Sequence, residues 1–217
     1  MPSTASPSYG SGVDVINELI MQAVASPWLY LVLFIVTVID GFFPPVPSET
    51  VLVAAAAVAT SAGGANLVLL GVIAAIGAAI GDNIAFLIGR SVGTTRFAWM
   101  RRRRVVAAFT AAQRSLEHRS AVLILGARYI PVGRVAVNMS AGALGFPWRR
   151  FVPLSIVGGT SWAVFSLAIG LLAGAWLKDQ PLMSAGLGIV IALLVGLVID
   201  RVAAVRRRRA SVPQLAG

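Results

Sequence analysis

Charged side chains occur at two places where proline interrupts long apolar segments of the chain. The first break spans Asp40 to Glu49 and carries acids, whereas the second spans Arg128 to Arg134 and carries arginines. A charge at the centre of a membrane-spanning helix costs about 2.5–3.5 kcal/mol on insertion scales. Irregular backbone at that depth must be buried in protein or line a water-filled cavity. Two broken segments of this kind indicate a transport site. The residues expected to break the helices are Pro44, Pro45, Pro47, Pro131 and Gly133.

Paired arginines beside helix ends predict a site for an anion. A half-helix that begins after each break exposes N–H groups and the positive end of its dipole. Two such ends together with Arg128 and Arg134 suit a phosphate group. Asn138, one helical turn after Arg134, either adds a polar contact to the ligand or forms an ordinary interhelical hydrogen bond. Asp40 and Glu49 serve as counter-charges in the empty site or as proton carriers, because burial favours the protonated form of a carboxylate.

A third acid, Asp82, lies inside the apolar stretch 67–89. At that depth it either pairs with an arginine across the bundle or binds a proton. The same stretch contains Gly77 and Gly81, four residues apart. Small residues at this spacing let neighbouring membrane helices approach closely, so we expect a packing face there.

The composition is that of an integral membrane protein. Hydrophobic residues make up 58% of the 217 residues and charged residues 12%, about half the charged fraction of a soluble domain. Much of the net charge of +10 comes from arginine clusters at 101–104, 149–150 and 206–209. Clusters that flank apolar segments indicate membrane topology and anionic headgroups. No basic face with base-stacking aromatics, as a nucleic-acid-binding protein needs, is visible.

The residue types argue against several enzymatic mechanisms. The chain has no cysteine and a single histidine, His118. The sequence therefore lacks the residues needed for zinc–thiolate sites and cysteine nucleophiles. It also lacks the histidines needed for phosphatase or rhomboid-like mechanisms. A phosphate-binding Gly-Lys-Ser/Thr loop is also missing from the sequence. We expect no catalytic residue, no metal and no cofactor, and we expect His118 on a cytoplasmic surface helix.

The apolar segments predict an all-α chain with one membrane domain at residues 13–200. A disordered tail, 1–12, precedes it and a basic cytoplasmic tail, 201–217, follows it. Ser48 is expected to N-cap the second half of the first broken segment. The expected elements are an interfacial helix at 13–25, half-helices at 28–43 and 50–59, a span at 67–89, an amphipathic helix at 105–118, half-helices at 121–127 and 135–146, and spans at 151–177 and 182–199.

Arginine positions predict how these segments lie in the membrane. The positive-inside rule places 90–104, 149–150 and 206–209 in the cytoplasm. The segment at about 120–148 then starts and ends in the cytoplasm and forms a re-entrant hairpin, while the segment at about 28–60 enters from outside. A single kinked span is the alternative for the latter. The predicted fold is an inverted-repeat-like bundle with two facing re-entrant helical hairpins, about three full transmembrane helices and interfacial amphipathic helices. The C-terminus is cytoplasmic and the N-terminus lies outside.

These residues resemble the motifs of the DedA family, also known as SNARE-associated or VTT-domain membrane proteins. The resemblance covers about residues 28–199 and implies a bacterial inner-membrane protein with two facing re-entrant loops. It also implies transbilayer movement of lipids, driven by a proton or sodium gradient. The commoner family residue at position 40 is Glu, so Asp40 keeps the charge with a shorter reach. The matching pieces are the run from Asp40 to Glu49, Gly81-Asp82 followed by Gly89-Arg90, and the run from Arg128 to Arg134 leading into Ala141-Gly142. The family's membrane acids fall on Asp40 and Glu49, and its paired arginines on Arg128 and Arg134.

Four functions are compatible with this pattern, and the first is favoured. It is a flippase for a polyprenyl-phosphate carrier lipid such as undecaprenyl phosphate, with arginines on the phosphate and acids coupling turnover to protons. A flippase or scramblase for phosphatidylethanolamine would use the acids for the amine. A proton-coupled antiporter of small cations or drugs would use the acids as its site. A membrane scaffold would recruit partners through its basic loops. The expected partners are thus membrane lipids and protons, and not nucleic acid.

Overall fold

The structure, a computed structural model, describes residues 12–96, 103–176, 186–187, 189–190 and 194. Within these residues the chain is entirely helical and contains no strand, which confirms the predicted all-α class. The seven helices, in chain order, are α1 (Gly12–Ala25), α2 (Trp28–Asp40), α3 (Ser48–Ala62), α4 (Leu67–Val92), α5 (Arg103–Ala127), α6 (Pro131–Ala143) and α7 (Trp148–Trp176).

Two of these helices are long and apolar enough to cross a membrane. α4 has 26 residues and α7 has 29, which corresponds to lengths of about 39 and 44 Å at 1.5 Å per residue. α1 and α2 meet the same test only as a pair, bent by 78° at the break between them. The third predicted span, 182–199, lies mostly outside the described residues. So do the predicted tails at 1–12 and 201–217, apart from Gly12.

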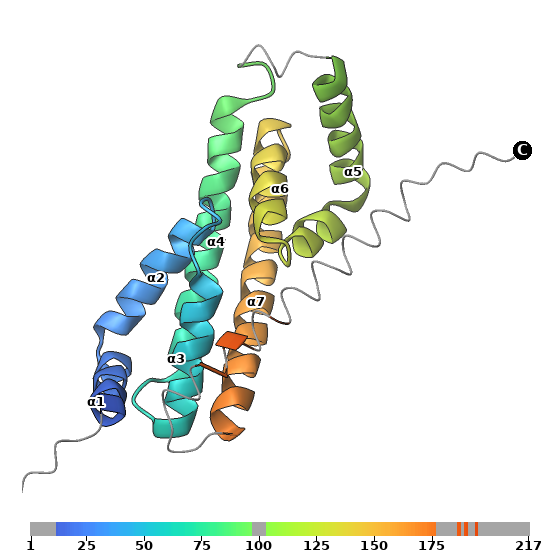
Figure 1. Cartoon of the computed structure of the whole chain (residues 1–217). Coiled ribbons are helices and arrows are strands. Elements are labelled where there is room, and N and C mark those ends of the chain that lie inside the picture. Colours follow the sequence, from blue (N-terminus) through green and yellow to red (C-terminus); the bar gives the residue numbers. More distant parts are fainter. Residues whose placement is uncertain (1–11, 97–102, 177–185, 188, 191–193, 195–217) are drawn as a thin grey trace, which may run out of the picture.

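Two helical hairpins pack against the long helices from opposite ends (Figure 1). α2 and α3 form the first, whose tip at residues 41–47 contains the three predicted prolines. α5 and α6 form the second, whose tip lies at residues 128–130. α4 supports α2 and α6, whereas α7 supports α3. Both tips lie near the middle of the long helices. The two charged breaks therefore lie at the same height along the bundle.

The first hairpin differs from its predicted form at the tip. α2 ends at Asp40, three residues before its predicted end at position 43. The backbone N–H of Phe42 donates to the carbonyl of Ile39, which forms a turn in place of a further helical turn. α3 begins at Ser48 with Pro47 at the N-cap position and no side-chain cap. The prediction that Ser48 caps α3 is therefore wrong. Its hydroxyl donates instead to the carboxylate of Asp40, a charged acceptor that makes a stronger hydrogen bond than a neutral one.

The second hairpin agrees with the prediction in its first arm and differs in its second. α5 is interrupted at Arg119, whose φ of −141° and ψ of 39° are not helical, so the predicted division between segments 105–118 and 121–127 is confirmed. His118 is exposed on α5, as expected of a surface helix. Pro131 and Gly133 do not lie in the turn but belong to the first turn of α6. Proline is favoured there because its missing N–H would be unpaired in any case.

Small residues let the helices approach closely at the level of the tips. A side-chain carbon added to Gly81 would lie 2.5 Å from the carbonyl oxygen of Val38, so only glycine allows α2 to contact α4 in this way. This contact confirms the predicted packing face at Gly77 and Gly81. α4 and α6 are equally close, since a side-chain carbon at Gly142 would overlap the carbonyl oxygen of Phe86.

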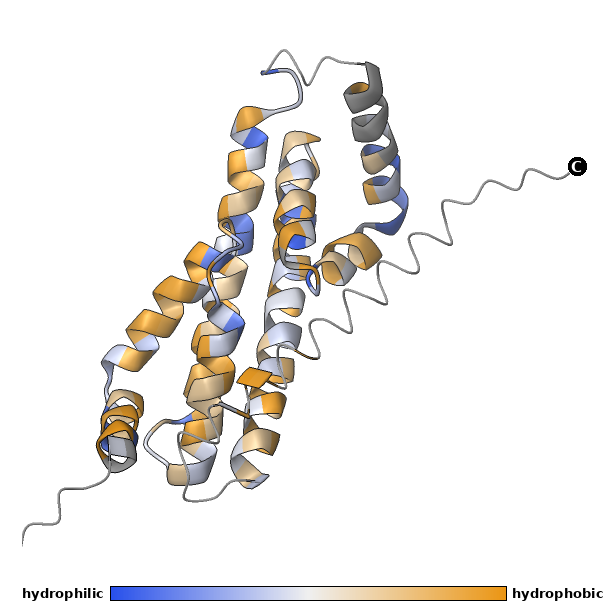
Figure 2. Cartoon of the chain, viewed as in Figure 1, coloured by the Kyte–Doolittle hydropathy of each residue, from blue (hydrophilic) through white to orange (hydrophobic). Residues whose placement is uncertain are grey.

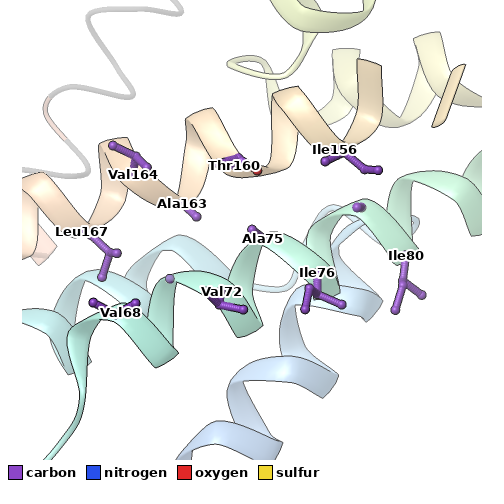
Figure 3. A pocket seen from close by; sticks show the side chains of 12 residues that line it. Val68, Val72, Ala75, Ile76, Ile80, Ile156, Thr160, Ala163, Val164 and Leu167 are labelled. Carbon is purple, nitrogen blue, oxygen red and sulfur yellow. The ribbon is translucent and has the colours of Figure 1, made fainter. Parts of the chain in front are cut away.

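Apolar residues predominate along α2, α4 and α7, and hydrophilic residues occur near the hairpin tips and on α5 (Figure 2). Val68, Val132 and Leu172 are each more than 60% exposed, as suits a surface that faces lipid. A groove of about 600 Å³ runs between α4 and α7 (Figure 3). The side chains that line it include Val72, Ile76 and Ile80 on α4 and Thr160, Val164 and Leu167 on α7.

Replacing Gly142 with alanine is expected to push α4 and α6 apart and to destabilise the fold by roughly 1–3 kcal/mol, the usual cost of overpacking. Thermal unfolding of the purified protein in detergent measures this as a lower Tm. Gly126→Ala is the matched control, because Gly126 lies on α5 with no atom within 4 Å of the added carbon. Equal Tm values for the two variants would contradict the close contact between α4 and α6.

Candidate functional site

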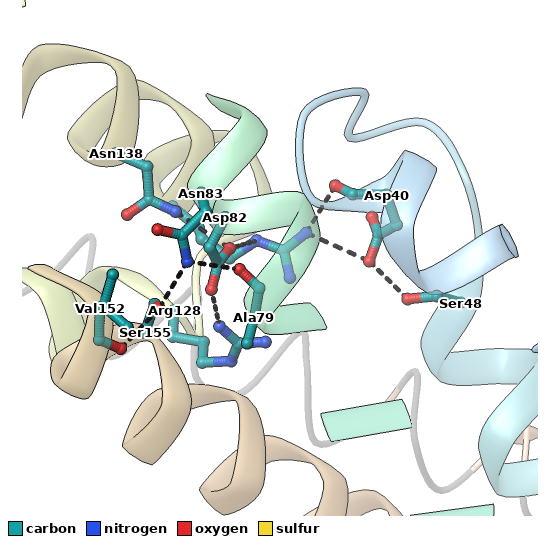
Figure 4. Close-up of polar contacts among 10 residues, drawn as sticks. Asp40, Ser48, Ala79, Asp82, Asn83, Arg128, Asn138, Val152 and Ser155 are labelled. Atoms are coloured by element: carbon teal, nitrogen blue, oxygen red, sulfur yellow. Dashed lines mark hydrogen bonds and ion pairs between the residues drawn. The ribbon is translucent and has the colours of Figure 1, made fainter. Parts of the chain in front are cut away.

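Four predicted charged residues and one predicted amide lie together where the two hairpin tips contact α4 (Figure 4). All five residues are buried, with exposures between 2% and 9%. Two arginines and two carboxylates make the cluster neutral, which is the condition under which charges can be buried without a large penalty. The residues are Asp40 at the end of α2, Asp82 on α4, Arg128 in the second tip, and Arg134 and Asn138 on α6.

Asp82 lies at the centre of the cluster. Its Oδ2 atom accepts a hydrogen bond from Nη1 of Arg128. Its Oδ1 atom accepts one from the amide of Asn138 at 3.0 Å and lies 3.8 Å from Nε of Arg134. Of the two roles that the sequence leaves open for Asp82, pairing with an arginine is the one that the geometry supports. Asn138 contacts this acid, so it forms an interhelical hydrogen bond between α6 and α4.

Arg134 joins the second hairpin to the first. Its Nη2 atom lies 3.1 Å from Oδ2 of Asp40 and donates to the main-chain carbonyl of Asp40 at 2.6 Å. That carbonyl belongs to the last residue of α2, where helix carbonyls lack internal partners and the dipole is negative. Ser48, the first residue of α3, donates to the same carboxylate. Arg134 therefore links α6 directly to α2 and, through Asp40 and Ser48, to α3.

Arg128 is buried but only partly satisfied. Its Nη1 atom pairs with Asp82, and its guanidinium carbon lies 5.7 Å from the centroid of the Trp162 ring. Its Nε and Nη2 atoms have no hydrogen-bond partner among the described residues, although both are buried. Buried donors are rarely left unpaired in folded proteins, so this group has capacity for a further acceptor.

Glu49 stands apart from the ion pairs. It lies in the first turn of α3, where a negative charge suits the helix dipole. It is half-buried and close enough to Asp40 and Arg134 to interact with both electrostatically. None of the ion pairs among the described residues includes it. Two of the three predicted membrane acids are thus engaged by arginines there, and Glu49 is not.

Several residues that shape the cluster were not predicted from the sequence. Trp162 stacks on Arg128 from α7, and no pattern marks it among the apolar residues around it. Asn83 donates to Ser155 at 3.0 Å and accepts from Trp148 at 2.8 Å, which bridges α4 to α7. Asn83 directly follows Asp82, so its polarity within an apolar span was the available signal. The contact between Ser48 and Asp40 requires knowledge of how the first tip closes.

The apolar groove is separate from the charged cluster. Arg128 packs beside Gly158 on α7, whereas Thr160 lines the groove. Residues two apart on a helix are about 200° apart around its axis. α7 itself therefore stands between the groove and the arginine. The charged side chains therefore lie outside the groove.

Within the described residues, an all-helical fold with two apolar spans and an ion-paired cluster between two broken segments defines a membrane protein with a polar site at mid-bundle. The chain matches the family model of the VTT domain over residues 46–172. It is 32% identical over 186 residues to the uncharacterized membrane protein Rv2637 of Mycobacterium tuberculosis, which covers 83% of this chain and 85% of that protein. The chain therefore belongs to the DedA family of VTT-domain membrane proteins.

Two further relatives extend this comparison. The inner membrane protein YabI of Escherichia coli is 30% identical over 111 residues, which is 51% of this chain and 44% of that protein. An alkaline phosphatase-like protein of Lactococcus lactis is 24% identical over 188 residues, covering 82% of this chain and 86% of that protein. No solved structure matches the chain. Relatives named as membrane proteins, together with the two apolar spans, show that this chain is a membrane protein.

Asp82→Asn is expected to destabilise the protein by about 3–5 kcal/mol, because it leaves Arg128 buried without its counter-charge. Adding Arg128→Gln should recover part of this loss. A double-mutant cycle on unfolding in detergent measures the coupling, with Glu117→Gln, an exposed acid on α5, as the control. Strictly additive losses would contradict a direct pair between the two residues.

Proposed function

We propose that the chain is a flippase that moves a polyprenyl-phosphate carrier lipid across the bacterial cytoplasmic membrane, driven by the proton-motive force. The observation that carries this proposal is the pairing of two buried arginines with two carboxylates where the hairpin tips meet. Guanidinium groups are the side chains best suited to bind phosphate. The carboxylates keep the cluster neutral when no phosphate is bound. Membership of the DedA family supports the same function.

In this proposal both hairpins are re-entrant and enter the membrane from opposite faces. The α2–α3 hairpin opens toward the end of the bundle where α4 begins, and the α5–α6 hairpin opens toward the end where α4 finishes (Figure 1). Arg90, Arg149 and Arg150 lie at that second end, in the last turn of α4 and the first turn of α7. The positive-inside rule assigns it to the cytoplasm. With a further span at 182–199, the C-terminus is cytoplasmic and the N-terminus lies outside.

Transport then proceeds by competition for the arginines. A phosphate binds Arg128, and opening of the tips releases Asp82 from Arg128 and Asp40 from Arg134. Each released carboxylate then takes up a proton, which removes its uncompensated charge. Loss of those protons on the opposite side of the membrane restores the ion pairs and expels the phosphate. Glu49, which is half-buried and outside the ion pairs, exchanges protons between the cluster and water. No bond of the lipid is made or broken.

Transport of phosphatidylethanolamine is the second candidate. Its phosphate would use the same arginines, and its amine needs a carboxylate that no arginine holds. Glu49 is such a carboxylate among the described residues. An antiporter for small cations is less well supported, because Asp40 and Asp82 are already engaged by arginines.

The neutral double variant Asp82→Asn/Arg128→Gln is expected to lose lipid movement even though it retains a compensated cluster. A charge-assisted hydrogen bond is worth about 1.5–3 kcal/mol, so the rate should fall about tenfold or more. The measurement is translocation of fluorescent polyprenyl phosphate in proteoliposomes, beside fluorescent phosphatidylethanolamine.

Glu117→Gln serves as the control in that assay. Unchanged translocation by the folded double variant would contradict the proposal, and faster movement of phosphatidylethanolamine would favour the second candidate. Release of inorganic phosphate from the lipid would instead indicate a phosphatase, the activity that the name of the Lactococcus relative suggests.

Glu49→Gln is expected to abolish the acceleration of lipid movement by a proton gradient while leaving movement without a gradient nearly unchanged. The amide keeps the shape of the side chain but cannot carry a proton. Translocation rates in proteoliposomes with and without an imposed pH gradient test this. Glu18→Gln, an exposed acid on α1, is the matched control. A full response to the gradient in Glu49→Gln would contradict the coupling role of this residue.

A further inference from the structure

The two arginines of the cluster differ in how their donors are used. We propose that Arg128 provides the edge that binds the phosphate, and that Arg134 is a latch that holds the two hairpin tips together. The proposal rests on the proposed function, because it divides the tasks of one site between its two arginines. It also departs from the simplest expectation, in which both arginines hold the phosphate equally.

Arg134 pairs with both acids of the cluster. Its Nη2 atom contacts both the carboxylate and the main-chain carbonyl of Asp40, at 3.1 and 2.6 Å. Ser48 donates to the same carboxylate from the start of α3, so the contact fixes both arms of the first hairpin. The Nε atom of Arg134 makes no hydrogen bond among the described residues, but it faces the carboxylate of Asp82 at 3.8 Å. Opening the tips requires these contacts to break.

Arg128 is hydrogen-bonded through only one of its three guanidinium nitrogens. Its Nη1 atom donates to Asp82, whereas its Nε and Nη2 atoms are buried without a partner among the described residues. Nε–H and the adjacent N–H of Nη2 form one side of the planar guanidinium group. That side can donate two parallel hydrogen bonds to two oxygens of a single phosphate or carboxylate. A partner at this edge would satisfy both buried donors at once.

α7 holds this edge in a fixed orientation. The guanidinium carbon of Arg128 lies 5.7 Å from the Trp162 ring centroid, a cation–π distance. The aliphatic part of the side chain passes Gly158, where an added carbon would lie 3.3 Å from Cδ of Arg128. Together with the bond to Asp82, these contacts restrict the plane of the guanidinium group. A donor pair that is already oriented binds its acceptor with less loss of side-chain freedom.

The ligand that fits is an oxyanion with two accessible oxygens on one atom, as in a phosphate monoester. The two oxygens of such a group can pair with Nε and Nη2 of Arg128 without displacing Asp82 from Nη1. Phosphate binding and tip opening then involve different arginines. Lipid phosphate and inorganic phosphate share this chemistry, so the experiment includes both.

The test measures tip separation and phosphate binding on the same samples. Because the chain has no cysteine, Phe43→Cys and Val132→Cys place one spin label on each hairpin near its tip, at side chains that are 54% and 71% exposed. Double electron–electron resonance in lipid nanodiscs gives the distance between the labels. Calorimetric titration with inorganic phosphate, and with geranylgeranyl phosphate, gives the affinities.

Arg128→Lys keeps the charge beside Asp82 but removes the two-donor edge. It is expected to weaken binding of both probes about tenfold or more and to leave the label distance unchanged. Arg134→Lys and Asp40→Asn are expected to lengthen or broaden the label distance while binding stays close to that of the wild type. Should Arg128→Lys fail to fold, the neutral pair Asp82→Asn/Arg128→Gln provides the same comparison.

Equal loss of binding in Arg128→Lys and Arg134→Lys would overturn the division of tasks, and so would opening of the tips by Arg128→Lys. Either result, with tight binding of geranylgeranyl phosphate by the wild type, would leave the proposed function standing. Absence of binding of both probes to the wild type would overturn the proposed function as well. Binding of inorganic phosphate alone would support the edge at Arg128 and overturn a lipid as its ligand.

Discussion

The neutralisation of Arg128 and Arg134 by Asp82 and Asp40 is the interaction on which the rest of the structure depends. Breaking a buried pair of this kind costs about 3–5 kcal/mol, so the four groups must stay within reach of one another. The acids come from α2 and α4, whereas the arginines come from the second hairpin. The ends of α2 and α5 and the starts of α3 and α6 are therefore held at the same level of the bundle. The position of both tips follows from this requirement.

Close helix packing is the second half of the same constraint. Aspartate side chains are short, so the backbones that carry them must approach each other. Gly81 next to Asp82 faces Gly41 next to Asp40, and a larger residue at either position would separate the two acids. The bond from Arg134 to the main-chain carbonyl of Asp40 does not depend on side-chain length. This contact is therefore available whichever acid stands at position 40.

The sequence predicted which residues would meet but not how they would pair. Prolines and charges within apolar segments located both tips, because such features are costly in a membrane unless they have a function. The pairing of Asp82 with Arg128 depends on the register between α4 and α6, which close contact at Gly142 fixes and which periodicity alone cannot reveal. Periodicity also could not distinguish Trp162 from the other apolar residues of its span. The helix boundaries at the tips depended on turn contacts that only the folded chain shows.

Whether phosphate enters the charged cluster is tested most directly by solid-state NMR of the protein in lipid bilayers. The measurement is the dipolar coupling between the phosphorus atom of bound polyprenyl phosphate and isotopically labelled arginine side-chain nitrogens. A strong coupling, as expected for directly hydrogen-bonded atoms, that disappears in Arg128→Lys is the predicted result. Bound lipid whose phosphorus couples to no arginine nitrogen, or a coupling that Arg128→Lys leaves unchanged, would contradict a phosphate site in the cluster.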